Sequence, residues 1–264
     1  MGIYTLNHID KLKDKWNRGE VCIGTAVQLT DSTISELLGE AGYDFIWVDC
    51  EHSSLGLTDT LNHLRTARGA GTATFIRVPS NDPVIMKPYL DLHPAGIIVP
   101  RINNIEDAKQ AIESFRYPPN GFRGFGPSRG ARFGKISAPD YLEQVEQQML
   151  LILQIEHIDA VNQIDAILDL PGVGSIVTGP ADLSGSMGFM NEFGHPKVVE
   201  AIERVYKAAI RKGIPTGHPT SYDPQGLRKW IGLGLSWISV DGDWITLYQH
   251  AKRVADDIRQ ISSS

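Results

Sequence analysis

The feature that most constrains the fold is an alternation of short apolar runs with helical patterns. Eight runs are rich in Val, Ile and Phe, as parallel strands buried on both faces require. They are Val21–Leu29, Phe45–Val48, Thr74–Val78, Gly96–Ile102, Leu150–Ile155, Ser175–Thr178, Ile214–Gly217 and Trp237–Val240. Because helical crossovers join parallel strands, eight such units predict an α/β fold, a closed (β/α)8 barrel.

Helical patterns stand between most of the strand runs. They are Ser32–Ala41, Thr58–Ala70, Pro83–Leu92, Ile105–Phe115, Ala160–Leu168, Pro196–Lys212, Pro224–Leu233 and Trp244–Ile258. Asn104 is placed to cap the helix that starts at Ile105, and Pro83 and Pro196 suit first helical turns. A further helix over Asn7–Asn17 is expected to cover the N-terminal mouth of the barrel. The long segment Tyr117–Ser137 is rich in Gly, Pro and Arg and precedes a helix over Pro139–Met149.

Size and charge narrow the class of protein. The 264 residues, 42% of them hydrophobic, are enough for one barrel domain spanning residues 1–264. A net charge of −6 argues against nucleic acid and anionic membranes as partners, so a small molecule is expected. The only cysteines are Cys22 and Cys50, and no apolar run approaches the length of a membrane span. These features favour a cytoplasmic protein without disulfides.

The predicted strands end in an unusually polar set of residues. In a barrel, catalytic groups lie at the C-terminal ends of the strands. The strand ends are Gln28, Asp49-Cys50-Glu51-His52, Arg77, Arg101, Glu156-His157, Asp182, His218 and Asp241-Gly242-Asp243. Since such groups are costly to bury without partners, their convergence predicts a site for an ion and a charged ligand.

Glu156 and Asp182 are the candidate metal ligands. They follow successive strand runs and lie about one strand, helix and return strand apart, so both acids are expected at the same sheet edge. Two carboxylates without cysteine favour Mg²⁺, Mn²⁺ or Co²⁺ over tetrahedral zinc. The alternative is that each acid caps the helix that follows its strand.

The lysines separate two kinds of carbonyl chemistry. No lysine falls inside a predicted strand, whereas a barrel enzyme that forms a Schiff base needs one there. If the reaction creates a carbanion beside a carbonyl, a metal ion is therefore the expected electron sink.

Several ordered motifs resemble one known family across almost the whole chain. They are Glu40-Ala41-Gly42-Tyr43-Asp44, Asp49-Cys50-Glu51-His52, Arg77-Val78-Pro79-Ser80-Asn81-Asp82-Pro83, Arg116-Tyr117-Pro118-Pro119, Gly121-Phe122-Arg123-Gly124, Gln154-Ile155-Glu156 and Gly179-Pro180-Ala181-Asp182-Leu183-Ser184. With them the chain resembles the metal-dependent class II pyruvate aldolases of the HpcH/HpaI type. That family includes 2,4-dihydroxyhept-2-ene-1,7-dioate aldolase and 2-dehydro-3-deoxyglucarate aldolase. The resemblance implies a TIM barrel of the phosphoenolpyruvate/pyruvate type.

The resemblance implies an activity and a set of roles. The reaction would cleave a 4-hydroxy-2-oxo acid to pyruvate and an aldehyde through a metal-stabilised pyruvate enolate. Glu156 and Asp182 would hold the divalent ion. Arg77 would stabilise the enolate, and the backbone N–H groups of Ala181 and Asp182 would receive the pyruvate carboxylate.

Further roles follow from the same resemblance. His52, oriented by Asp49, would transfer the proton to or from the substrate hydroxyl. Gln154 would support the metal site, and Asp91 would reach the site from a neighbouring subunit. The family also implies a homo-oligomer, a hexamer built as a trimer of dimers, in which the C-terminal helix packs on or exchanges with a partner subunit.

Departures from the family pattern concern the aldehyde. Arg101, Arg129 and Arg132 occupy altered positions, and we hypothesise that one of them recognises a carboxylated aldehyde. Two other functions stay open. One is a 2-oxo-acid decarboxylase or carbon–carbon bond-forming synthase that uses the same metal enolate, and the other is a barrel that binds small acids without turnover.

Overall fold

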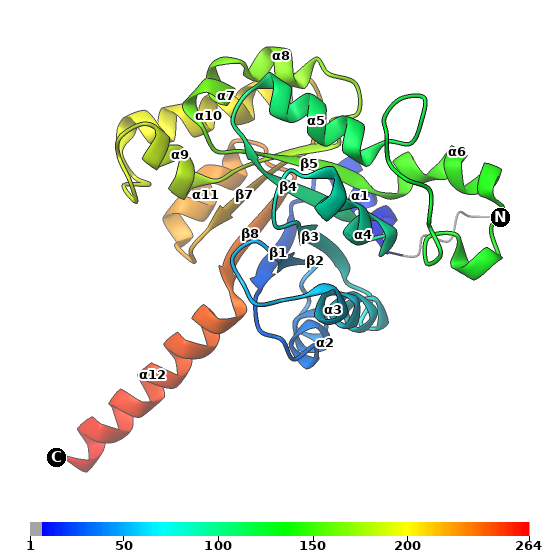
Figure 1. Cartoon of the computed structure of the whole chain (residues 1–264). Helices are drawn as coiled ribbons and strands as arrows, with labels where there is room; N and C mark the ends of the chain where they lie inside the picture. The colour runs from blue at the N-terminus through cyan, green and yellow to red at the C-terminus, as the bar shows by residue number, and fades with distance from the viewer. Residues whose placement is uncertain (1–6, 264) are drawn as a thin grey trace.

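The computed structural model describes residues 7–263, in which eight parallel strands close into a barrel surrounded by helices (Figure 1). Each strand pairs with the next along the chain, and β8 pairs with β1. The strands are β1 (Cys22–Val27), β2 (Phe45–Asp49), β3 (Ala73–Arg77), β4 (Gly96–Ile102), β5 (Leu150–Ile155), β6 (Ser175–Thr178), β7 (Thr216–Thr220) and β8 (Trp237–Gly242). The predicted (β/α)8 barrel is confirmed.

The helices largely follow the predicted patterns. They are α1 (Ile9–Asn17), α2 (Thr33–Glu40), α3 (Leu57–Gly69), α4 (Pro83–Asp91), α5 (Ile105–Phe115), α6 (Ala138–Gln148), α7 (Ile158–Asn162), α8 (Ile164–Leu168), α9 (Pro180–Ser186), α10 (Pro196–Arg211), α11 (Pro224–Gly232) and α12 (Asp243–Ser262), with a 3-10 turn over Arg132–Gly134. Asn104 caps α5 as predicted, since its side chain accepts hydrogen bonds from the N–H groups of Glu106 and Asp107.

Two elements differ from the prediction. The single helix expected over Ala160–Leu168 is divided into α7 and α8 at Gln163. The Gln163 side chain accepts a hydrogen bond from the Ile105 N–H (3.2 Å), so a contact with another helix accompanies the break. β7 begins and ends later in the chain than the predicted run Ile214–Gly217.

Aromatic side chains fill the N-terminal half of the barrel interior. Trp237 contacts Phe45 and Phe75 with ring centroids 5.5 Å apart in each case, and Trp47 lies 6.1 Å from it. Gly217 makes this possible, because a Cβ there would lie 2.0 Å from the Trp237 ring. The predicted cover is confirmed as well: α1 places Ile9 and Leu12 in this cluster. We call Phe45, Trp47, Phe75 and Trp237 the aromatic plug.

The C-terminal helix α12 extends away from the barrel (Figure 1). Of its described residues only Asp243 is buried, whereas large apolar side chains are exposed along its length. They are Trp244, Leu247, Tyr248, Val254, Ile258 and Ile261. Among the described residues, no helix is long and apolar enough to span a membrane.

Candidate active site

Asp49 and Arg77 form the centre of the polar end of the barrel. They are the last residues of neighbouring strands β2 and β3, and they stand opposite each other in the register. Arg77 donates from Nε (2.9 Å) and Nη2 (2.6 Å) to the two Asp49 oxygens, which makes a bidentate pair. Burial opposes ionisation of Asp49, but the hydrogen bonds from Arg77 hold its pKa below the ordinary value. The guanidinium therefore has a fixed position.

Gln28 ties this pair to other parts of the chain. Its Nε2 donates to Asp49 Oδ2 (2.8 Å) and to the His52 carbonyl (3.1 Å). Its Oε1 accepts a hydrogen bond from the indole of Trp244, in the first turn of α12. Gln28 ends strand one in the sequence, but no role was predicted for it.

Glu156 and Gln154 point into the same mouth from β5. Side chains two apart on a strand share a face, so both lie on the interior side while Ile155 packs outward. Gln154 Nε2 donates to Glu156 Oε2 (2.7 Å), and the Arg101 backbone N–H donates to Glu156 Oε1. Gly179 leaves room for this carboxylate, because a Cβ there would lie 2.4 Å from Glu156 Oε2.

The charges around Glu156 favour a positive ligand. Burial raises the pKa of Glu156 to about 7, and the negative charges of Glu51 and Asp182 add to the shift. Burial also raises the pKa of Glu51, whose Oε2 lies 3.1 Å from Arg77 Nη1 without hydrogen-bond geometry. Glu51 is thus a site residue to which the sequence analysis assigned no role, although it stands in the strand-end motif with Asp49.

Asp182 and Ala181 lie in the first turn of α9, directly after β6. The first N–H groups of a helix have no partner inside the helix, so those of Ala181 and Asp182 are available to an anion. Gly179, and not Asp182, holds the N-cap position. Glu156 is likewise held by Gln154 and the Arg101 backbone. The helix-cap alternative therefore does not describe Glu156, whereas Asp182 does stand in the first turn of a helix, where an acid is favoured.

A divalent ion fits the residues present. Among residues 7–263, no group of three or more His, Cys, Asp and Glu side chains is arranged to hold a metal by itself. Mg²⁺ commonly takes only one or two carboxylates and completes its shell with water and substrate. Gln154 Oε1 and Glu51 Oε2 are buried without a hydrogen-bond partner in the described part of the chain. These buried acceptors, together with the raised pKa of Glu156, form a set of groups that a divalent cation would stabilise.

His52 lies at the rim of this mouth. Its side chain is 60% exposed, and its Nε2 lies 3.6 Å from Glu51 Oε2. Asp49 contacts His52 through the backbone N–H (3.2 Å), while the Asp49 carboxylate is paired with Arg77. Within one chain, Glu51 is therefore nearer to the imidazole than the predicted orienting residue Asp49.

Asp91 lies elsewhere in the chain. It ends α4, and because barrel helices run antiparallel to the strands, this places it at the N-terminal end of the barrel. There it accepts a hydrogen bond from the buried Arg123 (3.1 Å). The structure does not bring it together with Glu156 and Asp182 in one chain, and its role across a subunit boundary stays a prediction.

Three other polar strand-end residues do not join the site. His218 points outward from β7, where its Nδ1 bonds the Tyr206 hydroxyl (2.9 Å) and its ring lies 4.2 Å from that of Trp230. Burial lowers its pKa to about 3, so it is a neutral core histidine. His157 accepts from the Asp159 N–H and caps α7, and Asp243 accepts from the N–H groups of Gln28 and Leu29. The expected convergence of all strand-end groups is therefore wrong for these residues.

Comparison with known proteins agrees with this arrangement. A sequence model of the family described as HpcH/HpaI aldolase/citrate lyase matches residues 24–241. This chain belongs to the HpcH/HpaI aldolase/citrate lyase family. The predicted family is confirmed, while the roles of individual residues stay predictions.

Similarity to HpcH/HpaI family members extends over nearly the full length. A 5-keto-4-deoxy-D-glucarate aldolase of Enterobacter sp. strain 638 is 33% identical over 252 residues, which cover 95% of this chain and 97% of that protein. A pyruvate aldolase of Rhizobium etli is 35% identical over 248 residues, or 94% and 96% of the two chains. The crystal structure of an HpcH/HpaI aldolase from Desulfitobacterium hafniense gives a TM-score of 0.87 at 30% identity, covering 94% of this chain and 96% of that one.

Proposed function

We propose that this protein is a class II aldolase, a lyase that cleaves a 4-hydroxy-2-oxo acid into pyruvate and an aldehyde. The observation that carries the proposal is one barrel mouth where Glu51, Glu156 and Asp182 lie near the Arg77–Asp49 pair. The eight strands contain no lysine, so an imine route has no residue to form it. The curated relatives named as aldolases support the same reaction class.

Glu156 and Asp182 would hold a divalent ion such as Mg²⁺, Mn²⁺ or Co²⁺, which supplies positive charge beside the keto and carboxylate oxygens of the substrate. Arg77 would stabilise the charge that develops on the keto oxygen as the C3–C4 bond breaks. Its bidentate pair with Asp49 fixes the guanidinium before the reaction starts. The N–H groups of Ala181 and Asp182 would receive the substrate carboxylate.

The proton has a separate route. In the cleavage direction, His52 would accept the proton of the C4 hydroxyl, and the C3–C4 electron pair would move into the pyruvate part. Protonation at C3 then gives pyruvate, and the C4 fragment leaves as an aldehyde. The position of His52 at an exposed rim, beside Glu51, supports proton exchange with solvent.

The test measures aldehyde-dependent consumption of pyruvate, with product identification, across neutral and acidic aldehydes. Chelation should abolish turnover, and Mg²⁺, Mn²⁺ or Co²⁺ should restore it. Glu156→Gln and Asp182→Asn should remove most activity, while Glu143→Gln, an exposed acid on α6, should behave as wild type. Full activity in both site variants would overturn the metal assignment. Turnover of a 2-oxo acid that does not depend on the aldehyde would favour a decarboxylase instead.

We further propose that the protein is a cytoplasmic homo-oligomer of one-domain subunits, a hexamer built as a trimer of dimers. The support is α12, whose apolar side chains are exposed in a single chain. Such a surface is typical of a subunit interface. Both cysteines are free and buried, which suits a reducing compartment.

A further inference from the structure

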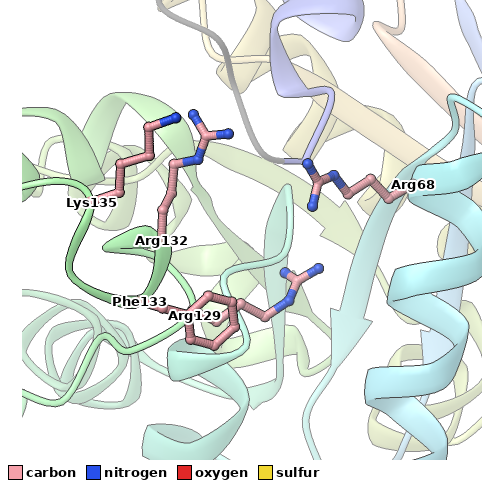
Figure 2. Close-up of a pocket in the computed structure, with 5 residues that line it drawn as sticks. All are labelled: Arg68, Arg129, Arg132, Phe133 and Lys135. Carbon is pink, nitrogen blue, oxygen red and sulfur yellow. The ribbon is translucent and has the colours of Figure 1, made fainter.

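A basic pocket lies at the N-terminal end of the barrel, opposite the candidate active site. Arg68, Arg129, Arg132, Phe133 and Lys135 line a cavity of about 280 Å³. Figure 2 shows Arg68 reaching from α3 towards the segment that carries the other four residues. Arg68 lies in the last helical turn of α3, and Arg129 donates to the carbonyl of Leu92, just after α4. Both helix ends face the N-terminal mouth, since the helices run antiparallel to the strands.

The pocket gathers positive charge in a chain whose net charge is −6. Burial, together with repulsion from Arg68 and Arg65, lowers the pKa of Arg129 to about 10. Positive charges that share one cavity repel one another, and a bound anion would reduce that repulsion. One hydrogen bond, from Arg129 Nη1 to the Leu92 carbonyl (2.7 Å), fixes the guanidinium in place.

The backbone of the pocket wall is also unusual. Arg132, Phe133 and Gly134 have φ values of 52°, 57° and 92°, which is the left-handed region. Side chains other than glycine rarely adopt it, and such strain concentrates at ligand-binding segments. Here it accompanies a Phe133 side chain that is 82% exposed. The segment thus presents two arginines and a lysine to one cavity at a conformational cost.

We propose that this pocket binds a small multivalent oxyanion, a phosphate or a polycarboxylate. Guanidinium groups bind both by the same forked pairs of N–H···O bonds. The volume suits a compact anion more than a large cofactor. Within one chain, the aromatic plug separates this pocket from Glu156 and Arg77, so the anion site is distinct from the metal site of the same chain. The hypothesis that Arg129 or Arg132 recognises a carboxylated aldehyde therefore requires the active site of a neighbouring subunit.

The test is calorimetric titration of the full-length protein with Mg²⁺ present and with ionic strength held constant. Inorganic phosphate and tricarballylate are the probes, so the two arms tell a phosphate site from a carboxylate site. We expect saturable binding of at least one probe. The double variant Arg68→Gln/Arg129→Gln should weaken it by about tenfold or more, since each lost charged hydrogen bond costs about that factor. Lys135→Gln, an exposed change that leaves the packing intact, should weaken it less.

The matched control is Arg211→Gln/Arg228→Gln, which removes the same charge from exposed positions on α10 and α11. It should bind as wild type does. The proposal fails if neither probe gives saturable heat, or if both double variants lose affinity equally. It also fails if Arg77→Ala removes the binding and the pocket variants do not, because the anion would then occupy the candidate active site.

Discussion

At the scale of single residues, Glu156 links the electrostatics of the site to the stability of the protein. The pKa of Glu156 in the folded protein, about 7, exceeds the ordinary glutamate pKa of 4.5. Between these pH values the folded state keeps a proton that the unfolded state has released. The contribution of Glu156 to the free energy of unfolding is therefore fully present below pH 4.5 and is lost as the pH rises through 7.

Glu156→Gln should prevent this loss of stability at high pH in metal-free protein, because glutamine does not ionise. We expect the variant to match wild type near pH 5 and to be more stable by about 3 kcal/mol at pH 8, since one pKa unit corresponds to about 1.4 kcal/mol. Urea unfolding in the presence of a chelator at both pH values measures the difference. Glu143→Gln, on the surface, serves as the control. A stability difference that does not change with pH would contradict the assigned cause.

Gln28 should act as a positioning residue for Asp49. Gln28→Met keeps the size of the side chain but removes its hydrogen bonds to Asp49, His52 and Trp244. A bond to a charged group is worth roughly one to two factors of ten, so kcat should fall about tenfold while KM changes little. Gln249→Met, an exposed glutamine on α12, is the control. Unchanged kcat in Gln28→Met would show that Gln28 is not needed to order Asp49.

At the scale of elements, substitutions on α12 should change the association of subunits without changing the fold of one chain. Leu247 and Ile258 are 61% and 60% exposed, so replacing both with serine removes little packing inside one chain. If a second copy covers them, each loss costs about 1.5–3 kcal/mol of association. Light scattering should then report smaller particles, with an unchanged circular dichroism spectrum. Lys252→Ser/Asp257→Ser on the same helix controls for surface change. A wild-type particle mass in the apolar variant would rule out this interface.

Elements also show where sequence patterns are sufficient. The run Leu150–Ile155 is apolar except for Gln154 and became β5 at the predicted bounds, because a barrel strand is buried on both faces. β7 contains Gly217 and Pro219, which weaken a strand pattern, and its bounds were missed. The break at Gln163 depends on a hydrogen bond from Ile105, a contact that local sequence does not record.

The sequence likewise predicted some features of the candidate site and not others. Asp49, Arg77 and Glu156 were visible because they end strands, and parallel strands end together. Which way a side chain points was not visible. Gly217 faces the aromatic plug, so His218, the next residue, faces the outer helices. The sequence of β7 does not show which of its residues face the barrel interior. The contacts of Gln28 depend on side-chain rotamers in three segments that are far apart in the sequence, and the spacing of residues does not predict rotamers.

At the scale of the whole molecule, the fold was predictable because its repeat is regular, while the polar end is irregular in every unit. A repeating pattern of burial specifies the strand order and closure. The strand ends and the loops after them carry the candidate site, and these loops differ in residue content and vary in length. Most motifs that carried the HpcH/HpaI family resemblance lie at strand ends and in the loops after them, and the family match agrees with them. Motifs therefore identified the family better than the regular alternation of strands and helices did.

The aromatic plug has a consequence for access. Phe45, Phe75 and Trp237 occupy the lower barrel without polar partners other than the bond from the Trp237 indole to Ser175 among the described residues. Water and ions therefore have no polar path along the barrel axis. Within one chain, substrate would therefore enter and both products would leave through the same opening, at the C-terminal ends of the strands.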